Sequence, residues 1–258
     1  MRQSNLRFWF GSDATRAIWE NAEVQGEVVY WSGIAKNYEI QKTRQIKTIL
    51  SVGAGYPRKG AHFLLDAFFL CIKENLIPED VKLVIVGFSD TVQDLKDFVS
   101  DIIVKVHESG FADRVQLVKS IDESQLEALY STCDLYVQPS FLECLPLAML
   151  KAMSKGIPVI TAHVDGCNEA IVDGVNGYTC PPRNSTILAK KIAHAIVNNE
   201  EAFHLGSLAQ NTFNQTFSLE ATKPHLFETL QKKGAKSAYT NLLSHDLNKK
   251  VKPLTELV

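Results

Sequence analysis

The sequence predicts an α/β fold built on a Rossmann-like, doubly wound parallel sheet. From residue 46 onward, short apolar runs of strand length alternate with amphipathic segments of helix length. Glycine or proline ends several of the apolar runs, as at Gly53, Gly87 and Pro139. Polar residues gather after the strands of segment 134–182, and open α/β sheets bind ligands at the carboxyl ends of their strands.

Composition bounds the class of protein. The 258 residues are enough for one large or two small domains, and the formal net charge of −2 gives no reason to expect nucleic acid or an acidic membrane as partner. We find no apolar run of membrane-spanning length and no signal-peptide core, so we expect a soluble, cytoplasmic protein without a transmembrane segment. The five cysteines are dispersed and predict reduced thiols rather than disulfides or a metal site: Cys71, Cys133, Cys144, Cys167 and Cys180.

The first 45 residues give the weakest signals for helices and strands. LRFWF has the composition of a strand, Asp13 is placed to cap a helix that extends to about Asn21, and EVVYW predicts a second short strand.

The regular alternation begins at IKTILSVG, a strand that ends in glycine. AHFLLDAFFLCIKEN follows as a helix with one apolar face, VKLVIVG as a strand, residues 92–106 as a helix and RVQLV as a strand. Asp122 and Gln125 form a capping-box pattern at the start of the helix ESQLEALYSTC.

The segment 134–182 continues the pattern with more polar loops. DLYVQP is a strand stopped by Pro139, PLAMLKAMSKG is a helix that ends at Gly156, and IPVIT is a buried strand. Residues 186–198 form another amphipathic helix, and residues 217–233 predict a closing helix.

The same segment carries a long motif. Its members are Pro139, Ser140, Glu143, Pro146, Ala152, Met153, Gly156, Pro158, Val159, Gly166, Glu169, Gly174 and Gly177. In spacing and residue type this motif resembles the signature of the retaining glycosyltransferases of family 4 (group 1). The resemblance implies the C-terminal, donor-binding half of a GT-B fold, which binds a nucleotide-sugar.

The resemblance also implies a division of the chain. Residues 1–45 are expected to be the tail of an N-terminal acceptor domain with its linker, or an extension that only packs on the sheet edge. Residues 46–205 would form the nucleotide-sugar-binding domain, 206–235 C-terminal helices, and 236–258 an irregular tail.

The first strand-to-helix loop, Gly53 to Gly60, is expected to hold the donor's diphosphate. Similar proteins carry an Arg directly after the first glycine and a Lys before the last one. Lys59 matches, whereas Ala54 stands at the Arg position, a loss of about 1.5–3 kcal/mol of charge-assisted bonding. The neighbouring Arg58 is counted among the donor-binding residues, but we expect it to point elsewhere than Lys59, so that it does not automatically replace the missing Arg. The alternative for the loop is a solvated basic turn.

Glu143 is expected to face the hydroxyls of the donor sugar, because a carboxylate accepts two hydrogen bonds at once. The backbone amides from Cys144 through Leu145 and Pro146 to Leu147 would lie against the sugar or phosphate at the start of a helix. The alternative is that Glu143 only caps this helix.

Lys151 stands where similar proteins have a second Glu that holds the ribose. Three hypotheses remain open: Lys151 replaces the cation missing at Ala54, the donor site works with altered contacts, or the site has decayed. Gly166 and Glu169 match a further donor loop. Asp165 replaces its first glycine, which costs backbone freedom if the position needs positive φ, although Asp tolerates such a φ better than most residues. Gly87 ends a strand whose following residues would border the nucleobase.

The resemblance therefore implies transfer of a sugar from a UDP-, GDP- or ADP-sugar to an acceptor hydroxyl with retention. Lys59 and Glu143 would be the catalytic residues, with no metal and no further cofactor. The acceptor domain could be a separately encoded partner, in which case this chain alone would be inactive. The alternative is a degenerate, non-catalytic module that binds a partner transferase subunit.

Overall fold

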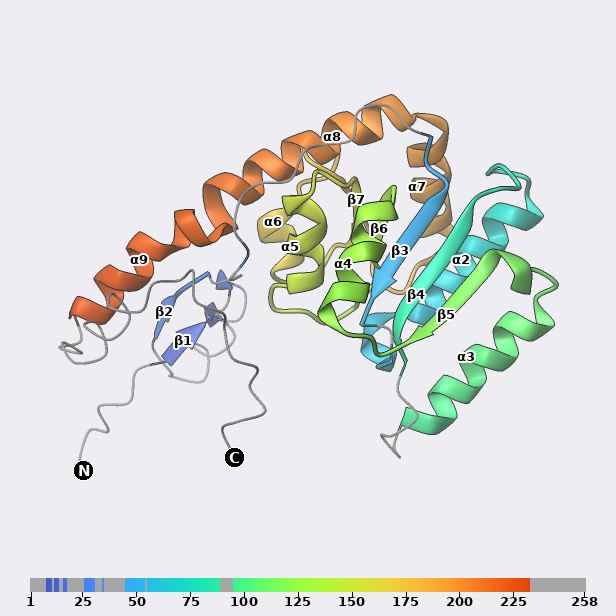
Figure 1. Ribbon diagram of the computed structural model, residues 1–258, viewed down its shortest axis with the longest axis horizontal. Coiled ribbons are helices and arrows are strands. Elements are labelled where there is room, and N and C mark those ends of the chain that lie inside the picture. Colours follow the sequence, from blue (N-terminus) through green and yellow to red (C-terminus); the bar gives the residue numbers. More distant parts are fainter. Residues whose placement is uncertain are drawn as a thin grey trace.

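A six-stranded parallel sheet forms the centre of the computed structural model (Figure 1). The structure describes residues 8–10, 12–13, 16–17, 26–30, 34, 45–53, 55–88 and 95–232. The strand order is β5-β4-β3-β6-β7-β8, and every neighbouring pair is parallel. The strands are β3 (Thr48–Val52), β4 (Lys82–Phe88), β5 (Val115–Lys119), β6 (Leu135–Gln138), β7 (Val159–Ala162) and β8 (Tyr178–Cys180).

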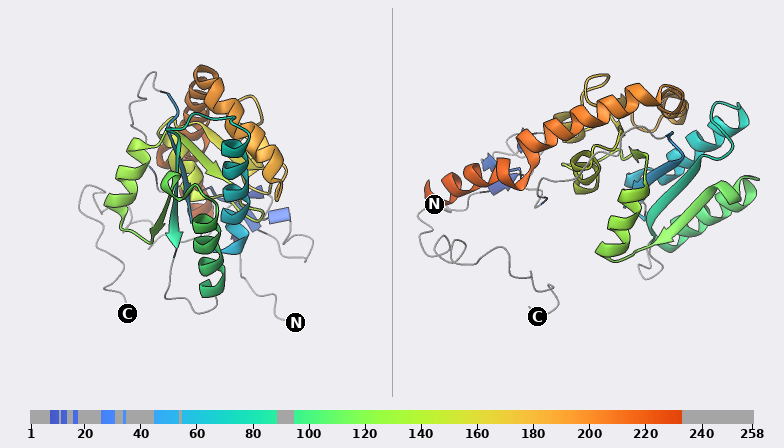
Figure 2. Two further views of the ribbon diagram at one scale, coloured as in Figure 1. Left: turned by 90° about the vertical axis from the view of Figure 1, so that its right-hand side faces the viewer. Right: turned by 45° about the horizontal axis from the view of Figure 1, so that its top comes forward.

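Helices cover both faces of this sheet, as the predicted doubly wound fold requires (Figure 2). The α-helices are α2 (Ala61–Lys73), α3 (Lys96–Glu108), α4 (Glu123–Thr132), α5 (Leu147–Ser154), α6 (Cys167–Ala170), α7 (Ser185–Val197), α8 (Asn199–Thr212) and α9 (Leu219–Lys232). Shorter helical turns are η1 (Pro57–Lys59), η3 (Ala112–Arg114) and the π-helix η4 (Phe213–Phe217).

Two apolar cores lie on opposite faces of the sheet. Helices α2, α3 and α7 bury their apolar sides in one core, around Leu64, Phe68 and Ile192. Helices α4, α5 and α6 pack into the other core with η4, around Met153 and Phe213. The predicted fold class is confirmed.

The chain changes face between two adjacent strands. Strand β3 leads into α2 on one face, and its neighbour β6 leads into α5 on the other. The two loops therefore leave the carboxyl edge of the sheet toward opposite faces, and the crevice outside such a switch point is the usual ligand position in open α/β sheets.

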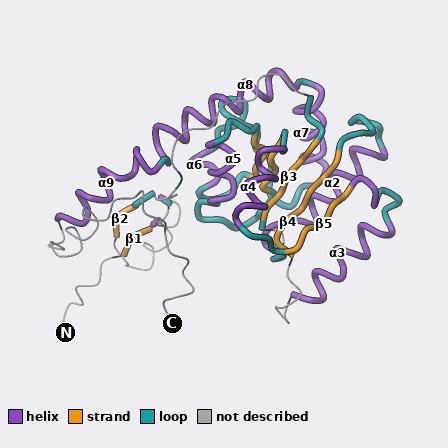
Figure 3. The backbone as a smooth tube through the Cα atoms, viewed as in Figure 1, coloured by secondary structure: helices purple, strands orange, loops and turns teal. Residues whose placement is uncertain are grey.

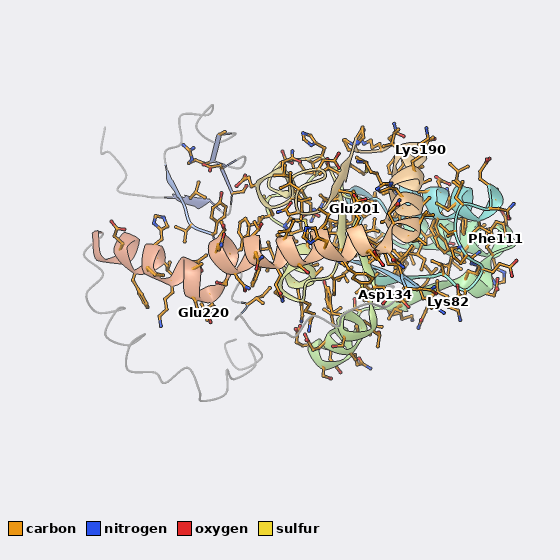
Figure 4. The ribbon with its side chains drawn as sticks, turned by 90° about the horizontal axis from the view of Figure 1, so that it is seen from above. Lys82, Phe111, Asp134, Lys190, Glu201 and Glu220 are labelled. Atoms are coloured by element: carbon orange, nitrogen blue, oxygen red, sulfur yellow. The ribbon has the colours of Figure 1, made fainter. Side chains whose placement is uncertain are left out.

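At the amino ends of the strands, Asp134 holds β3 and β6 together. Its carboxylate accepts hydrogen bonds from the backbone N–H groups of Lys47 (3.0 Å) and Thr48 (2.9 Å), where β3 begins. Figure 4 shows Asp134 and Lys82 at this end of the sheet. These bonds fix β3 against β6, so that the loops at the far ends of both strands are held in register.

Most predicted elements are found, with local additions. The capping box of α4 is confirmed, because Asp122 accepts from the Gln125 N–H (2.8 Å) and the Gln125 side chain accepts from the Asp122 N–H (3.3 Å). Strand β8 and residues 199–205 of helix α8 were not predicted, whereas residues 206–212 of α8 fall within the expected C-terminal helices. The expected boundary between residues 205 and 206 falls inside α8.

Helices α8 and α9 extend from the sheet toward a separate small sheet (Figures 1 and 3). That sheet consists of β1 (Phe8–Phe10) and β2 (Gly26–Val28), which pair in parallel, as part of each predicted N-terminal strand. Most of the helix predicted from Asp13 to Asn21 lies outside the described residues, as does the tail 236–258.

The N-terminal part contacts helices of the larger domain. The Tyr30 ring packs edge-on against Phe217 at 5.2 Å between centroids, and the Leu219 N–H donates to the carbonyl of Ile34 (3.0 Å). The described contacts thus involve α6, η4 and α9 rather than an edge strand. Within the described part of the chain, we find no helix with the length and apolarity needed to span a membrane.

Candidate functional site

The loop from β3 to α2 is shaped by glycines at positive φ. Gly53 has φ +91° and Gly60 has φ +77°. A Cβ on Gly60 would lie 2.3 Å from the carbonyl oxygen of Pro139, so this loop touches the one that follows β6. Between the glycines, η1 presents Arg58 and Lys59 at the crevice.

The loop from β6 to α5 rests on buried polar groups. The Tyr136 hydroxyl donates to the Gln138 side chain (2.6 Å), whose amide donates in turn to Ser140 (2.6 Å), and all three residues are buried. The Phe141 N–H donates to the carbonyl of Arg58 (3.0 Å). These bonds join the two loops and fix the backbone that precedes Glu143.

Two cations meet one carboxylate between the loops. The Lys59 ammonium donates to Oε1 of Glu143, and the Arg58 guanidinium lies 3.6 Å from the same oxygen. Glu143 is only 8% exposed, whereas Arg58 is 44% exposed. The prediction that Arg58 points elsewhere is wrong, because its side chain bends toward Glu143 and also donates to the carbonyl of Leu142 (3.1 Å).

Glu143 does not cap α5. The N-cap residue of that helix is Pro146, with no side-chain cap bond, and the Glu143 carboxylate is engaged by Lys59 instead. Pro146 has no amide hydrogen, so the prediction that its backbone amide donates to the ligand is wrong. The first turn nevertheless starts at the crevice, with Cys144 and Leu147 exposed, Leu145 half-buried and Pro146 buried.

The loop after β7 packs directly onto this segment. A Cβ on Gly166 would lie 1.3 Å from the carbonyl oxygen of Cys144, so only glycine fits there. Asp165, which stands in place of a glycine, has φ +31°. Gly166 thereby brings the loops after β6 and β7 into contact.

Lys151 points away from the two cations and toward α4. Its ammonium is paired with Glu123 and also lies 2.9 Å from Glu127, which in turn pairs with Lys155. Burial lowers the pKa of Lys151, but the bonds to both carboxylates outweigh burial and raise it overall. The geometry does not support the hypothesis that Lys151 replaces the missing cation, because its charge is already balanced.

Glu169 contacts the N-terminal segment, which the sequence pattern did not predict. Its Oε2 accepts from the Tyr30 hydroxyl (2.6 Å) and from the Asp13 N–H (3.1 Å). Burial, followed by the bond to Glu169, raises the pKa of Tyr30 well above its usual range. In this structure Glu169 therefore connects α6 to the N-terminal part of the chain.

The remaining predicted donor positions are Gly87, near the end of β4, and Ala54. Gly87 has φ +107°, and its carbonyl oxygen would be 2.5 Å from a Cβ on Gly55, so the loops after β3 and β4 also touch. Ala54 lies outside the described residues. Among the described residues, no group of three or more His, Cys, Asp or Glu side chains is arranged to hold a metal ion.

The arrangement provides two positive side chains and a helix start at a crevice, with one buried carboxylate between the cations. Lys59 and Arg58 can bind a diphosphate, because charge-assisted bonds to phosphate oxygens are strong. Glu143 can accept hydrogen bonds from hydroxyl groups once it separates from the cations.

Comparisons with known proteins show the family of the chain. Residues 36–212 match the family described as "Glycosyl transferases group 1". The chain is 28% identical over 193 residues to spore coat protein SA of Bacillus subtilis, covering 72% of this chain and 49% of that protein. It is 28% identical over 197 residues to alpha-1,3/1,6-mannosyltransferase ALG2 of Dictyostelium discoideum, covering 72% and 46%. The chain thus spans about half the length of these two relatives.

Solved structures show the same fold. Anabaena HepE in complex with UDP and glucose superimposes with a TM-score of 0.75 at 24% identity, covering 86% of this chain and 62% of that chain. Sucrose-phosphate synthase of Thermosynechococcus elongatus gives a TM-score of 0.75 at 22% identity, covering 90% and 59%. The neighbours are GT-B glycosyltransferases, and the chain is one Rossmann-like half of that fold. Because the family match spans most of its length, this chain belongs to the group 1 glycosyl transferases.

Proposed function

We propose that this chain binds a nucleotide diphosphate sugar and supplies the donor half of a retaining glycosyltransferase. The observation that carries the proposal is the cluster of Lys59, Arg58 and Glu143 at the crevice between β3 and β6. Two cations at the switch point of a parallel sheet suit the diphosphate of such a donor. The HepE complexes with UDP, with UDP and glucose, and with UDP-glucose support the same class of ligand.

In the proposed reaction the diphosphate is the leaving group. The bond between the anomeric carbon and the diphosphate oxygen breaks, and the electron pair stays with the phosphate. Lys59 and Arg58 stabilise that charge, and the acceptor oxygen forms the new bond to the anomeric carbon and passes its proton to the departing diphosphate oxygen. Catalysis then depends mainly on positioning and on electrostatic stabilisation of the leaving group.

Glu143 has a second part in this proposal. When the diphosphate takes the two cations, the carboxylate is released and can accept hydrogen bonds from the donor sugar's hydroxyls. Gly166 keeps the Glu143 loop in place by its close approach to Cys144. The acceptor would come from outside the donor domain, either through the N-terminal part or through a separately encoded partner.

A thiol-protection experiment tests donor binding. Cys144 is the exposed member of the five cysteines, and it adjoins Glu143. Cys71, Cys133, Cys167 and Cys180 are buried, and burial raises the pKa of Cys167 to about 12. One thiol per chain should therefore react quickly with a thiol reagent, and Cys144→Ser should abolish that reaction.

We expect UDP-, GDP- or ADP-glucose to slow this reaction at least tenfold, while glucose alone does not. Unchanged labelling with every nucleotide, in a chain shown to be folded, would contradict the proposal. It would favour the alternative of a non-catalytic module that binds a partner transferase subunit.

A further inference from the structure

Helix α6 is a single turn that depends on other elements for its position. It spans Cys167–Ala170, and no side chain among the described residues caps its N-terminus. One turn is not stable by itself, because ordering its backbone costs more free energy than its few hydrogen bonds contribute. The Glu169 carboxylate of this turn binds the N-terminal part of the chain, where its Oε2 accepts from the Tyr30 hydroxyl (2.6 Å) and from the Asp13 N–H (3.1 Å).

The bond between Tyr30 and Glu169 is of a strong kind. Bonds from a hydroxyl to an ionised carboxylate are typically about 2.5–2.7 Å long and are stronger than bonds between neutral groups. Both side chains are half-buried, so water competes with this bond less than it does on an open surface. Because burial and the bond to Glu169 raise the pKa of Tyr30, its hydroxyl stays protonated and remains a donor at neutral pH.

Tyr30 is itself attached to the larger domain. Its ring packs edge-on against Phe217, with 5.2 Å between centroids, and Phe217 is buried in η4. Four residues further along the chain, the carbonyl of Ile34 accepts from the Leu219 N–H (3.0 Å). The hydroxyl that Glu169 binds is therefore held in place by an apolar contact and by a backbone bond close to it in the sequence.

The other end of α6 packs on the loop that carries Glu143. Gly166, which precedes the helix, comes so close that a Cβ there would lie 1.3 Å from the carbonyl oxygen of Cys144. Cys167 begins the helix and is completely buried. Burial raises the pKa of its thiol to about 12, and the nearby charge of Glu143 adds to this effect. A displacement of α6 must therefore also displace the loop of Glu143.

We propose that Tyr30 and Glu169 are positioning residues of the donor site. Their bond holds α6 against the loop after β6 and thereby fixes the place where the Glu143 carboxylate meets the sugar. Glu169 thus acts through α6 and not as a ligand of the donor. The sugar contact rests on the proposed function, whereas the fixing of α6 can be measured without any donor.

The buried thiol of Cys167 reports on α6 directly. In a Cys144→Ser background, the four remaining thiols are buried and react with a thiol reagent only when their surroundings open. We expect Tyr30→Phe to speed the labelling of Cys167 at least fivefold, as followed by peptide mass spectrometry. The labelling of Cys71, Cys133 and Cys180 should not change. Tyr178→Phe is the matched control, because it removes a hydroxyl that lies 3.4 Å from Glu201, outside α6.

Two results of the labelling experiment would overturn the proposal. Unchanged labelling of Cys167 in Tyr30→Phe would show that the bond does not hold α6. Equal acceleration of all four thiols would show that the bond only supports the stability of the whole fold. Glu169→Gln keeps an oxygen that accepts from Tyr30, so it should label more slowly than Glu169→Ala.

Calorimetric titrations test the effect on the donor site. UDP-, GDP- and ADP-glucose are each compared with the corresponding nucleoside diphosphate. We expect Tyr30→Phe to weaken the binding of the nucleotide sugar at least threefold and that of the diphosphate less than twofold, because only the sugar contacts Glu143. Equal weakening of both ligands, or of neither, would overturn the positioning of Glu143. If the unmodified chain bound none of these ligands, the proposed function would fail instead, and Cys167 labelling would still decide whether the bond holds α6.

Discussion

The Lys59 ammonium and the Glu143 carboxylate are in direct contact, although 84 residues separate them in the sequence. Each belongs to a loop that leaves the sheet toward a different face, and the contact closes the crevice between those loops. The carboxylate therefore pairs with the same cations that we propose to bind diphosphate.

The first prediction concerns this competition. Glu143→Gln should free Lys59 and Arg58 and thereby tighten the binding of UDP about fivefold, which corresponds to about 1 kcal/mol. Sugar transfer by the assembled enzyme should fall, because the amide is a weaker acceptor for the sugar's hydroxyls. Calorimetric titration with UDP, which has no sugar, measures the first effect alone. The exposed Glu74→Gln serves as control, and weaker binding of UDP by Glu143→Gln would contradict the competition.

The second prediction concerns Gly166. Gly166→Ala places a methyl group on the carbonyl of Cys144, so the loops after β6 and β7 must separate. We expect a loss of about 1–3 kcal/mol in the free energy of unfolding, measured in urea, together with weaker UDP binding. Gly110→Ala is the matched control, since it introduces strain at φ +79° without a collision. If Gly166→Ala were as stable as the unmodified chain, the loop could move aside without energetic cost, which would contradict this prediction.

Much of the fold could be predicted because its signals are local. The Asp122 and Gln125 pattern identified the start of α4. Strand β8 was missed because it has only three residues, too few to show a period. The first half of helix α8 was missed because its polar first turn weakens the helical pattern.

The site was less predictable because its contacts join distant segments. That Arg58 and Lys59 reach the same carboxylate depends on the bend of a long side chain, which residue spacing does not encode. The partners of Lys151 lie on α4, and those of Glu169 lie near the N-terminus. These pairs come from packing of whole elements, so only the structure reveals them.

The third prediction concerns the ion pairs between α4 and α5. Glu127→Gln removes the carboxylate shared by Lys151 and Lys155, and we expect a loss of about 1 kcal/mol in the free energy of unfolding at pH 7. Burial opposes the charged form of Glu127, but its bonds to Lys155 and then Lys151 lower its pKa overall.

The pH dependence of that loss has a defined sign. Because the folded-state pKa of Glu127 is depressed, its contribution is complete above its unfolded value of about 4.3 and disappears as the pH falls through the folded value. Urea unfolding of both proteins between pH 7 and pH 2.5 should therefore show the two stabilities converging in acid. A difference that stays constant over this range would mean that the carboxylate's charge is not the cause.

The most direct test of a diphosphate site at Lys59 is a calorimetric titration. UDP-, GDP- and ADP-glucose are titrated into the unmodified chain and into Lys59→Ala, with Lys73→Ala as control. At least one nucleotide sugar should bind the unmodified chain and Lys73→Ala equally. Lys59→Ala should bind it at least tenfold more weakly, since a charge-assisted bond to phosphate contributes about 1.5–3 kcal/mol. Equal affinity of Lys59→Ala and the unmodified chain, with both shown to be folded, would contradict a diphosphate site at Lys59.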